Sequence, residues 1–376
     1  MELDLATPVA RRTDDEPAAV RAQRAWWFEP LVFWITFRVS HLVIFRLAGN
    51  WPHGASYQWD DGFYRQIVRH GYYRIHEESW QPTNFFPLIA WLVRAVQVFV
   101  VSETLAILIV TTAAQIAAAL AVYETARRLR DRSVARWSLA LFLAFPAALF
   151  LWMLYAEALF VALSAGALLA AHRDRPLLAG VAGAAVAMTR VVGIMIVLPL
   201  AVAHLVNRRR IDRDAAWLAL PFAGLGVVMF MQWWQGGDAL GFAHTTGPWG
   251  HTTTLPWQTV IDRIDIARTL HLTGVNFAID VGAQLAFVAL AALAIRNHRR
   301  WPLPLLLWFV LMTIAHLASG LKFSWARYML DAWPGFIVAA DWMHRRPRVA
   351  RWALLTLFVL LTVNRYQQWG AGSFIG

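Results

Sequence analysis

Long apolar blocks constrain this chain more than any other feature of its sequence. Blocks of roughly 17–25 residues, the length that crosses a hydrocarbon core of about 30 Å, recur along most of it. Arginine-rich segments separate many of these blocks, and Trp residues often lie at block ends, where amphipathic rings settle at a membrane interface. The pattern predicts an all-α, polytopic integral membrane protein with about ten or eleven membrane segments.

The composition supports a membrane protein and argues against several other classes. Of the 376 residues, 59% are hydrophobic and only 15% are charged, whereas a soluble domain carries about 25% charged residues. The net charge is +11, but the Arg residues fall between apolar blocks, as the positive-inside rule expects, so we expect no nucleic-acid binding. The absence of Cys excludes disulfides, iron–sulfur clusters and thiolate metal sites.

The chain is predicted to hold one folded domain. Residues 1–27 are rich in charge and lack an apolar core, so we expect a disordered cytoplasmic tail. Residues 28–376 should form a single transmembrane domain. Its two long polar loops, residues 49–84 and 235–276, face the outside if the arginine-rich segments face the cytoplasm.

Two stretches do not fit simple crossings. Residues 176–204 are too long for one span and are interrupted by Arg190 and Gly193, so two short or half-spans are expected. If the arginine-rich segment 127–136 is cytoplasmic, residues 85–126 must make an odd net number of crossings. Residues 85–101 are then re-entrant or interfacial; the alternative is that segment 127–136 faces out.

The first external loop carries adjacent carboxylates, Asp60 and Asp61, at the start of a short amphipathic stretch. Phe63, Tyr64 and Ile67 give that stretch one apolar face, which suits a helix lying in the membrane interface. One Asp can cap such a helix. A carboxylate held at the membrane surface can also act as a general base on an acceptor hydroxyl.

Charged side chains inside apolar blocks are costly and are functional candidates by default. Glu157 lies at the outer end of one block, and Arg190 offers a planar fork of donors suited to phosphate. The structural alternative is that these two residues pair with each other. The first block also contains Arg38, His41 and Arg46.

Cations of the last outer loop, Lys322 and Arg327 together with His316, can meet an anionic group or can anchor the chain at the interface. His244 lies in a loop rich in aromatic and polar residues, which suits sugar stacking, and its spacing from His251 is not that of a metal site. These features suggest transfer from a lipid-linked phosphate sugar. An Asp would accept a proton and Arg or Lys would stabilise the departing phosphate, with no need for a nucleotide-binding motif.

Five motifs, in this order, resemble those of the family of the second mannosyltransferase of GPI-anchor synthesis and its bacterial relatives. They are Trp59-Asp60 with Tyr64, Ile67 and Gly71-Tyr72; Phe85-Phe86-Pro87-Leu88; Tyr155-Ala156-Glu157; Thr189-Arg190-Val191-Val192-Gly193; and Ala326-Arg327-Tyr328 followed by Pro334. Two positions depart from the family pattern, since Asp61 stands where relatives often carry a small or neutral residue and Ala326 where they often carry Ser.

The resemblance implies a GT-C-type glycosyltransferase that uses a polyprenyl-phosphate sugar, expected to be mannose, with inversion. It assigns catalysis to Asp60, with Asp61 as the second candidate. We expect the donor phosphate to meet Arg190, Lys322 and Arg327, and the other substrate contacts to come from four residues, Tyr64, Glu157, His244 and Tyr328.

The Arg- and Ala-rich composition and short length look bacterial, and bacteria lack GPI anchors. The expected acceptor is therefore a different glycolipid, a glycan or a protein at the outer face of the cell membrane. No cofactor is expected; a divalent ion could assist the phosphate, but no ligand cluster indicates one. The rival hypotheses are a transporter or flippase of a lipid-linked sugar, an undecaprenyl-glycan polymerase or ligase, and a non-catalytic membrane scaffold.

Overall fold

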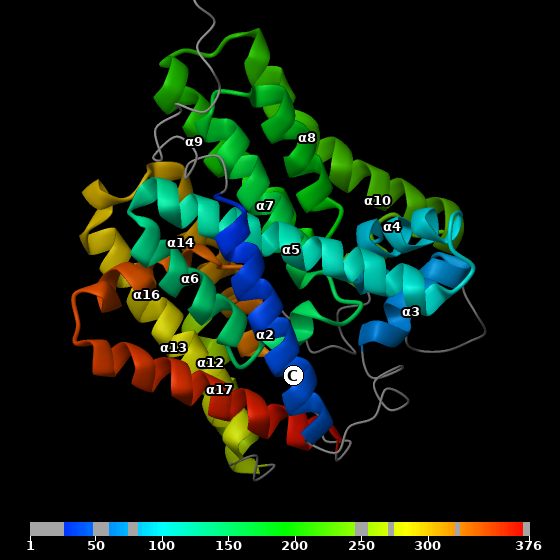
Figure 1. Cartoon of the computed structure of the whole chain (residues 1–376). Coiled ribbons are helices and arrows are strands. Elements are labelled where there is room, and N and C mark those ends of the chain that lie inside the picture. Colours follow the sequence, from blue (N-terminus) through cyan, green and yellow to red (C-terminus); the bar gives the residue numbers. More distant parts are fainter. Residues whose placement is uncertain are drawn as a thin grey trace, which may run out of the picture.

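The computed structural model describes residues 26–47, 60–73, 82–244, 255–269, 274–319 and 324–370. All regular structure in these ranges is helical (Figure 1). The predicted all-α class is therefore confirmed. Most of the predicted tail, and much of both predicted polar loops, lie outside the described residues.

Within the described ranges, six helical segments are long and apolar enough to cross a membrane: α2 (Phe28–Leu47), α5 (Glu103–Leu129), η4 with α9 (Val191–Arg208), η5 with α10 (Arg213–Gly236), α13 (Val275–Arg296) and most of α17 (Arg348–Gly370). Four apolar helices are shorter: α4 (Leu88–Gln97), α7 (Glu157–His172), α8 (Pro176–Ala187) and α14 (Leu303–Ala318). These lengths and compositions are those of an all-α membrane protein.

Shorter elements connect and cover these helices. They are α3 (Asp60–His70), η2 (Pro82–Asn84), α6 (Arg132–Ala144), η3 (Ala148–Leu151), α11 (Gly241–His244), α12 (Pro256–Thr269), η7 (His298–Arg300), α15 (Trp325–Tyr328) and α16 (Pro334–His344). Residues 325–342 are divided between α15 and α16 by a turn that precedes Pro334.

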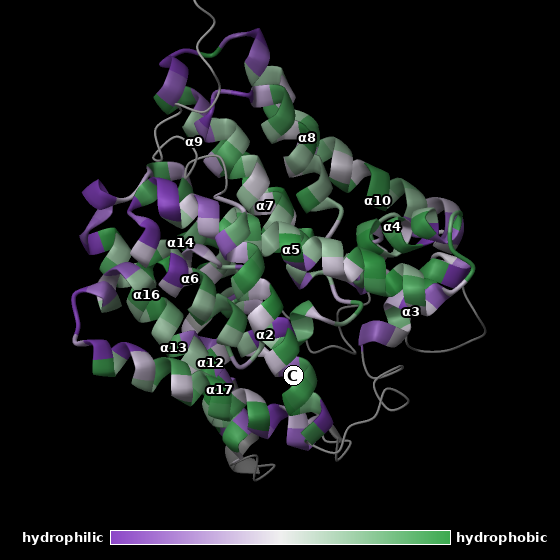
Figure 2. Ribbon diagram, in the orientation of Figure 1, coloured by the Kyte–Doolittle hydropathy of each residue, from purple (hydrophilic) through white to green (hydrophobic). Residues whose placement is uncertain are grey.

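The outer faces of the long helices are apolar, as a lipid environment requires. On α10, Phe230, Trp233 and Trp234 are 53%, 55% and 65% exposed. Hydrophobic residues cover the visible sides of the helices in Figure 2, while hydrophilic ones gather at their ends. Because contiguous apolar surface of this kind is avoided in water, it supports a membrane location.

Small residues let the central helices approach closely. α8 packs against both α7 and α10. A Cβ on Gly224 of α10 would lie 2.3 Å from the carbonyl oxygen of Ala184 on α8, and one on Gly180 would lie 2.0 Å from that of Trp217. Helix pairs in membranes pack in this way because Gly allows backbone contact where no hydrophobic driving force between helices exists.

All five arginine-rich segments lie at one end of the helix bundle, here called the basic end: residues 127–136, 172–175, 207–213, 296–300 and 344–351. Arg130 Nε lies 3.0 Å from Asp341, and its Nη2 donates to the carbonyl of Arg300 at 2.8 Å. Arg208 reaches Asp174 at 2.8 Å. Hydrophilic segments accordingly line the upper and left edges of Figure 2.

The start of α2 lies beside the arginine-rich segment 127–136. Glu29 pairs there with Arg132, at 2.7 Å, and with Arg136, so α2 begins at the basic end beside segment 127–136. α4 has 10 residues, about 15 Å of helix, which is too short to cross. α5 therefore ends at the basic end, where segment 127–136 lies beside Glu29 and Arg300.

Candidate active site

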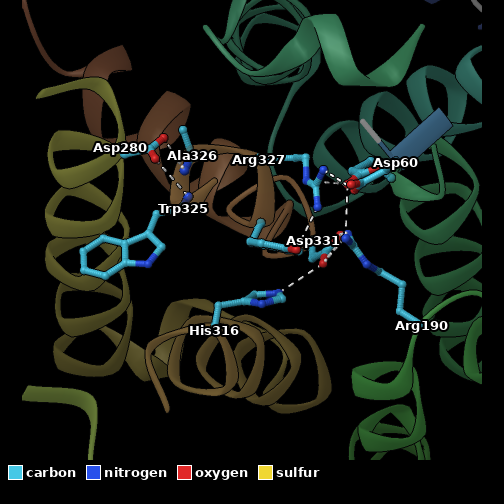
Figure 3. Close-up of polar contacts among 10 residues, drawn as sticks. Asp60, Arg190, Asp280, His316, Trp325, Ala326, Arg327 and Asp331 are labelled. Atoms are coloured by element: carbon cyan, nitrogen blue, oxygen red, sulfur yellow. Dashed lines mark hydrogen bonds and ion pairs between the residues drawn. The ribbon is translucent and has the colours of Figure 1, made fainter. Parts of the chain in front are cut away.

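Charged side chains from distant parts of the chain meet at the end of the bundle opposite the basic end (Figure 3). Asp331 is fully buried, and even the two most exposed side chains, Asp60 and Arg190, are only 14% and 13% exposed. We call this group the ion cluster; its members are Asp60, Glu157, Arg190, His316, Arg327 and Asp331.

Asp60 reaches the cluster because α3 is amphipathic and docks by its apolar face. Tyr64, Ile67 and Val68 are buried on that face. The helix ends at Gly71, whose φ of +68° is readily adopted only by Gly; a Cβ there would lie 2.4 Å from Oε1 of Gln235. The predicted amphipathic helix is thus present, and Asp60 is its first residue.

Arg327 holds the carboxylate of Asp60. Its Nη1 donates to Asp60 Oδ2 at 2.5 Å, its Nη2 donates to the hydroxyl of Tyr328 at 2.7 Å, and its Nε lies 3.2 Å from Glu157 Oε1. The guanidinium also faces the rings of Tyr155 and Tyr328, 5.2 and 4.8 Å from their centroids. A planar fork that serves several partners at once is specific to Arg.

Arg190 connects the other two carboxylates. Its Nη1 donates to both oxygens of Asp331, at 3.0 and 2.9 Å, and its Nη2 donates to Glu157 Oε1 at 3.1 Å. The residue lies in extended backbone between α8 and η4, so the predicted interruption of this span and the predicted structural pairing with Glu157 are both confirmed.

His316 completes the cluster from the end of α14. Its Nε2 lies 3.1 Å from Asp331 Oδ2, and its ring stacks on Tyr328 with centroids 5.0 Å apart. The cluster then holds three carboxylates against two guanidiniums, and a protonated His316 would make it neutral. Buried charges are tolerated only when paired in this way.

A second buried ion pair, between Asp280 and Arg365, holds the helix that carries Arg327. The carboxylate of Asp280, on α13, accepts the backbone N–H groups of Trp325 and Ala326 at 3.3 and 3.1 Å, which are the first residues of α15 (Figure 3). Arg365 of α17, itself fully buried, donates to Asp280 at 3.0 Å. This contact fixes the short helix that carries Arg327.

Sequence reasoning missed Asp280, Asp331 and Arg365, although the signal was present. Each is a charged residue within an apolar block, and such residues are rare unless they pair or function. The same rule about charged residues in apolar blocks identified Glu157 and Arg190. Applied to every apolar block, it also identifies Asp280, Asp331 and Arg365.

The structure separates the two adjacent Asp residues. Asp61 points away from the cluster and pairs with Arg65 at 2.6 Å; Arg65 and Arg69 in turn reach Glu103 at 2.8 Å each. These ion pairs, here called the α3–α5 ladder, join α3 to the start of α5. Burial raises the pKa of the Asp61 carboxyl, although the Arg65 guanidinium opposes that effect.

The remaining predicted site residues have different fates. Tyr64 is buried against Phe85 beside the cluster, and burial raises the pKa of its phenol above the usual range, so the phenol stays neutral. His244 is exposed and bonds Asp238 at 2.7 Å, with no contact to the cluster among those described. Lys322 lies outside the described residues. No group of three or more potential metal ligands occurs in the described ranges.

No family model and no curated protein matches the chain. The resemblance stated above therefore rests on the five motifs alone. The structure brings residues from all five close together: Asp60, Glu157, Arg190 and Arg327 meet in the ion cluster, and Phe85 packs on Tyr64.

Proposed function

We propose that this protein is a membrane glycosyltransferase that moves a sugar, with mannose as the expected one, from a polyprenyl-phosphate donor to an acceptor hydroxyl. The observation that supports this function is the carboxylate of Asp60, bonded to Arg327 at the end of the bundle opposite the basic end. Since arginine-rich ends face the cytoplasm, this carboxylate belongs at the extracytoplasmic surface of a cell membrane, expected to be bacterial.

The proposed reaction is one displacement with inversion. The acceptor oxygen attacks the anomeric carbon as its proton passes to Asp60, while the bond from that carbon to the phosphate oxygen breaks. The lipid monophosphate leaves with the electron pair. A positioned base contributes on the order of 10²–10⁴-fold to such a step, and a nearby cation stabilises the charge that develops on the leaving group.

Arg327 has two uses in this scheme. Its guanidinium donates to Oδ2 of Asp60 and so holds that oxygen in place. A donor phosphate that drew Arg327 toward itself would release Asp60 at the moment when a base is needed. The nearby contacts of Arg190 with Glu157 and Asp331 would keep the rest of the cluster in place.

Several assignments remain predictions within this proposal. They are phosphate contacts by Arg190, Lys322 and Arg327, substrate contacts by Tyr64, Glu157, His244 and Tyr328, and an acceptor that is a glycolipid, a glycan or a protein. A polymerase or ligase of undecaprenyl-linked glycans would use the same arrangement.

One observation favours a second function, a proton-coupled transporter of a lipid-linked sugar. His316 Nε2 and Asp331 Oδ2 lie 3.1 Å apart, and both side chains are buried; buried Asp and His residues serve as proton relays in transporters. Proteoliposomes loaded with polyprenyl-phosphate [³H]mannose and an acceptor separate the two functions. The enzyme moves label to the acceptor, whereas a transporter moves the intact lipid between leaflets without cleaving it.

A further inference from the structure

The role proposed for the ion cluster leaves the charged residues of α2 unexplained. Arg38 lies nine positions after Glu29, about 14 Å along the helix from the basic end, well inside a span. Its guanidinium lies 4.0 Å from the centroid of the Trp152 ring, and its Nη1 is 3.5 Å from Gln115 Oε1. No carboxylate of the described residues pairs with it. His41, by contrast, is satisfied by the hydroxyl of Tyr366 at 2.9 Å and the carbonyl of Leu143 at 3.3 Å.

Arg38 faces a groove of about 680 Å³ between α2, α3, α5, the segment 149–154 and the end of α17. This volume is within the range of about 300–1,000 Å³ that holds organic ligands. The lining is mainly apolar, and its charged members are Arg38, Arg46, Asp61 and Arg65. We call it the α2 groove.

The α2 groove opens sideways toward the lipid. Four of its lining residues, Val39, Leu42, Val43 and Leu47, are about half exposed or more. In a membrane these side chains face hydrocarbon, so a flexible apolar chain can enter from the bilayer without passing through water.

The α2 groove is lined in part by residues that are close in sequence to members of the ion cluster. Asp61 and Arg65 line it, and they belong to the helix that begins with Asp60. Met153 and Leu154 also line the groove, and they lie four and three residues before Glu157, the first residue of α7. The groove therefore adjoins the segments that carry Asp60 and Glu157.

Arg38 differs in its partners from Arg65, Arg190 and Arg327. Arg65 already bonds Asp61 and Glu103, and in the cluster Arg190 and Arg327 already bond carboxylates. A guanidinium within a span that has no carboxylate partner calls for an anion, and a phosphate offers the matching acceptors.

We propose that the α2 groove binds the isoprenoid chain of a lipid monophosphate and that Arg38 binds its phosphate. This inference rests on the proposed function, because it names where the lipid carrier of that reaction is held once the sugar has been transferred. The lateral opening suits one long flexible chain, and the cation suits the single phosphate that the sugar-free carrier bears after it has left Arg327.

The test measures binding of sugar-free, radiolabelled polyprenyl phosphate to the purified full chain in nanodiscs of neutral lipid. Arg38→Gln should weaken binding by roughly tenfold or more, the effect of losing one charged hydrogen-bonding partner. Arg38→Lys should retain most of the affinity, because the charge remains. Arg94→Gln, at an exposed arginine of α4 outside the groove, is the control and should bind like the wild type. Polyprenol, which lacks the phosphate, should bind the wild type and Arg38→Gln equally.

Leu42→Trp tests the groove itself by filling it, and should weaken binding of both polyprenyl phosphate and polyprenol. Unchanged binding by Leu42→Trp, or equal affinity of Arg38→Gln and wild type, would overturn the inference. So would competition by phosphatidylglycerol as strong as that by unlabelled polyprenyl phosphate, which would make this an ordinary phospholipid site. Because the assay records binding without transfer, Arg38-dependent binding by a chain that transfers no sugar would sink the proposed enzyme and leave the lipid site standing.

Discussion

Arg327 donates a 2.5 Å hydrogen bond to Asp60, 267 positions earlier in the chain. One partner begins α3, near the start of the described chain, and the other lies on α15, near its end. The pair therefore forms only when the whole bundle is assembled, and its geometry reports on both the fold and the proposed chemistry.

Removing the positive charge of Arg190 should lower the stability of the folded protein. Arg190→Met leaves Asp331 and Glu157 without their shared guanidinium, and breaking a buried ion pair costs about 3–5 kcal/mol. The melting temperature in detergent should fall sharply. The double variant Arg190→Met with Asp331→Asn should recover part of the loss because one buried charge is also removed. A double variant less stable than Arg190→Met would contradict the pairing.

Asp280 should affect transfer through the position of Arg327. Asp280→Leu combined with Arg365→Met removes both members of a buried pair, and such replacements are often neutral for stability. The first N–H groups of α15 then lose their acceptor, so we expect a folded protein with a lower kcat and a nearly unchanged KM for the donor. The companion single variant Asp280→Leu should melt earlier, since Arg365 stays buried and unpaired. Full kcat in the double variant would refute this positioning role.

Close packing of α8 on α10 gives a matched pair of glycine variants. Gly224→Ala places a Cβ 2.3 Å from the carbonyl oxygen of Ala184. A Cβ on Gly226, two residues later on α10, meets nothing within 4 Å. Overpacking costs about 1–3 kcal/mol, so Gly224→Ala should lower the melting temperature and Gly226→Ala should not. Similar melting curves for the two variants would mean that the helices are less closely packed than described.

The membrane orientation can be read by cysteine labelling, since the chain has no Cys to give background. Ala243→Cys, on exposed α11 beyond the end of α10, should react with an impermeant maleimide in intact spheroplasts. Arg299→Cys, at the basic end, should react only after permeabilisation. The reverse pattern would place the ion cluster in the cytoplasm and remove the extracytoplasmic site from the proposal.

Much of the architecture follows from the sequence because apolar length and arginine placement are local signals. The span interrupted at Arg190 was predicted, and so was the amphipathic helix behind Asp60. The end of α4 at Gln97 could not be predicted, because residues 88–101 are apolar apart from Arg94 and Gln97 and contain no Gly or Pro that would end a helix there.

The partners within the site depend on tertiary contacts. Sequence reasoning could name Asp60, Glu157, Arg190 and Arg327, but it could not decide between Asp60 and Asp61 for the cluster. Adjacent residues on a helix point about 100° apart, so the docking of α3 decides which carboxylate meets Arg327. Asp280 and Asp331 act through contacts with residues far along the chain, and no short motif records those contacts.

The most direct test of the central claim measures transfer of radiolabelled mannose from polyprenyl-phosphate mannose by membranes that carry equal amounts of wild type, Asp60→Asn or Asp61→Asn. Loss of the base should reduce transfer by Asp60→Asn on the order of 10²–10⁴-fold. Asp61→Asn changes a carboxylate that pairs with Arg65 rather than with Arg327, and should retain most of the activity. Equal transfer by wild type and Asp60→Asn, or a collapse confined to Asp61→Asn, would contradict the assignment of Asp60 as the base.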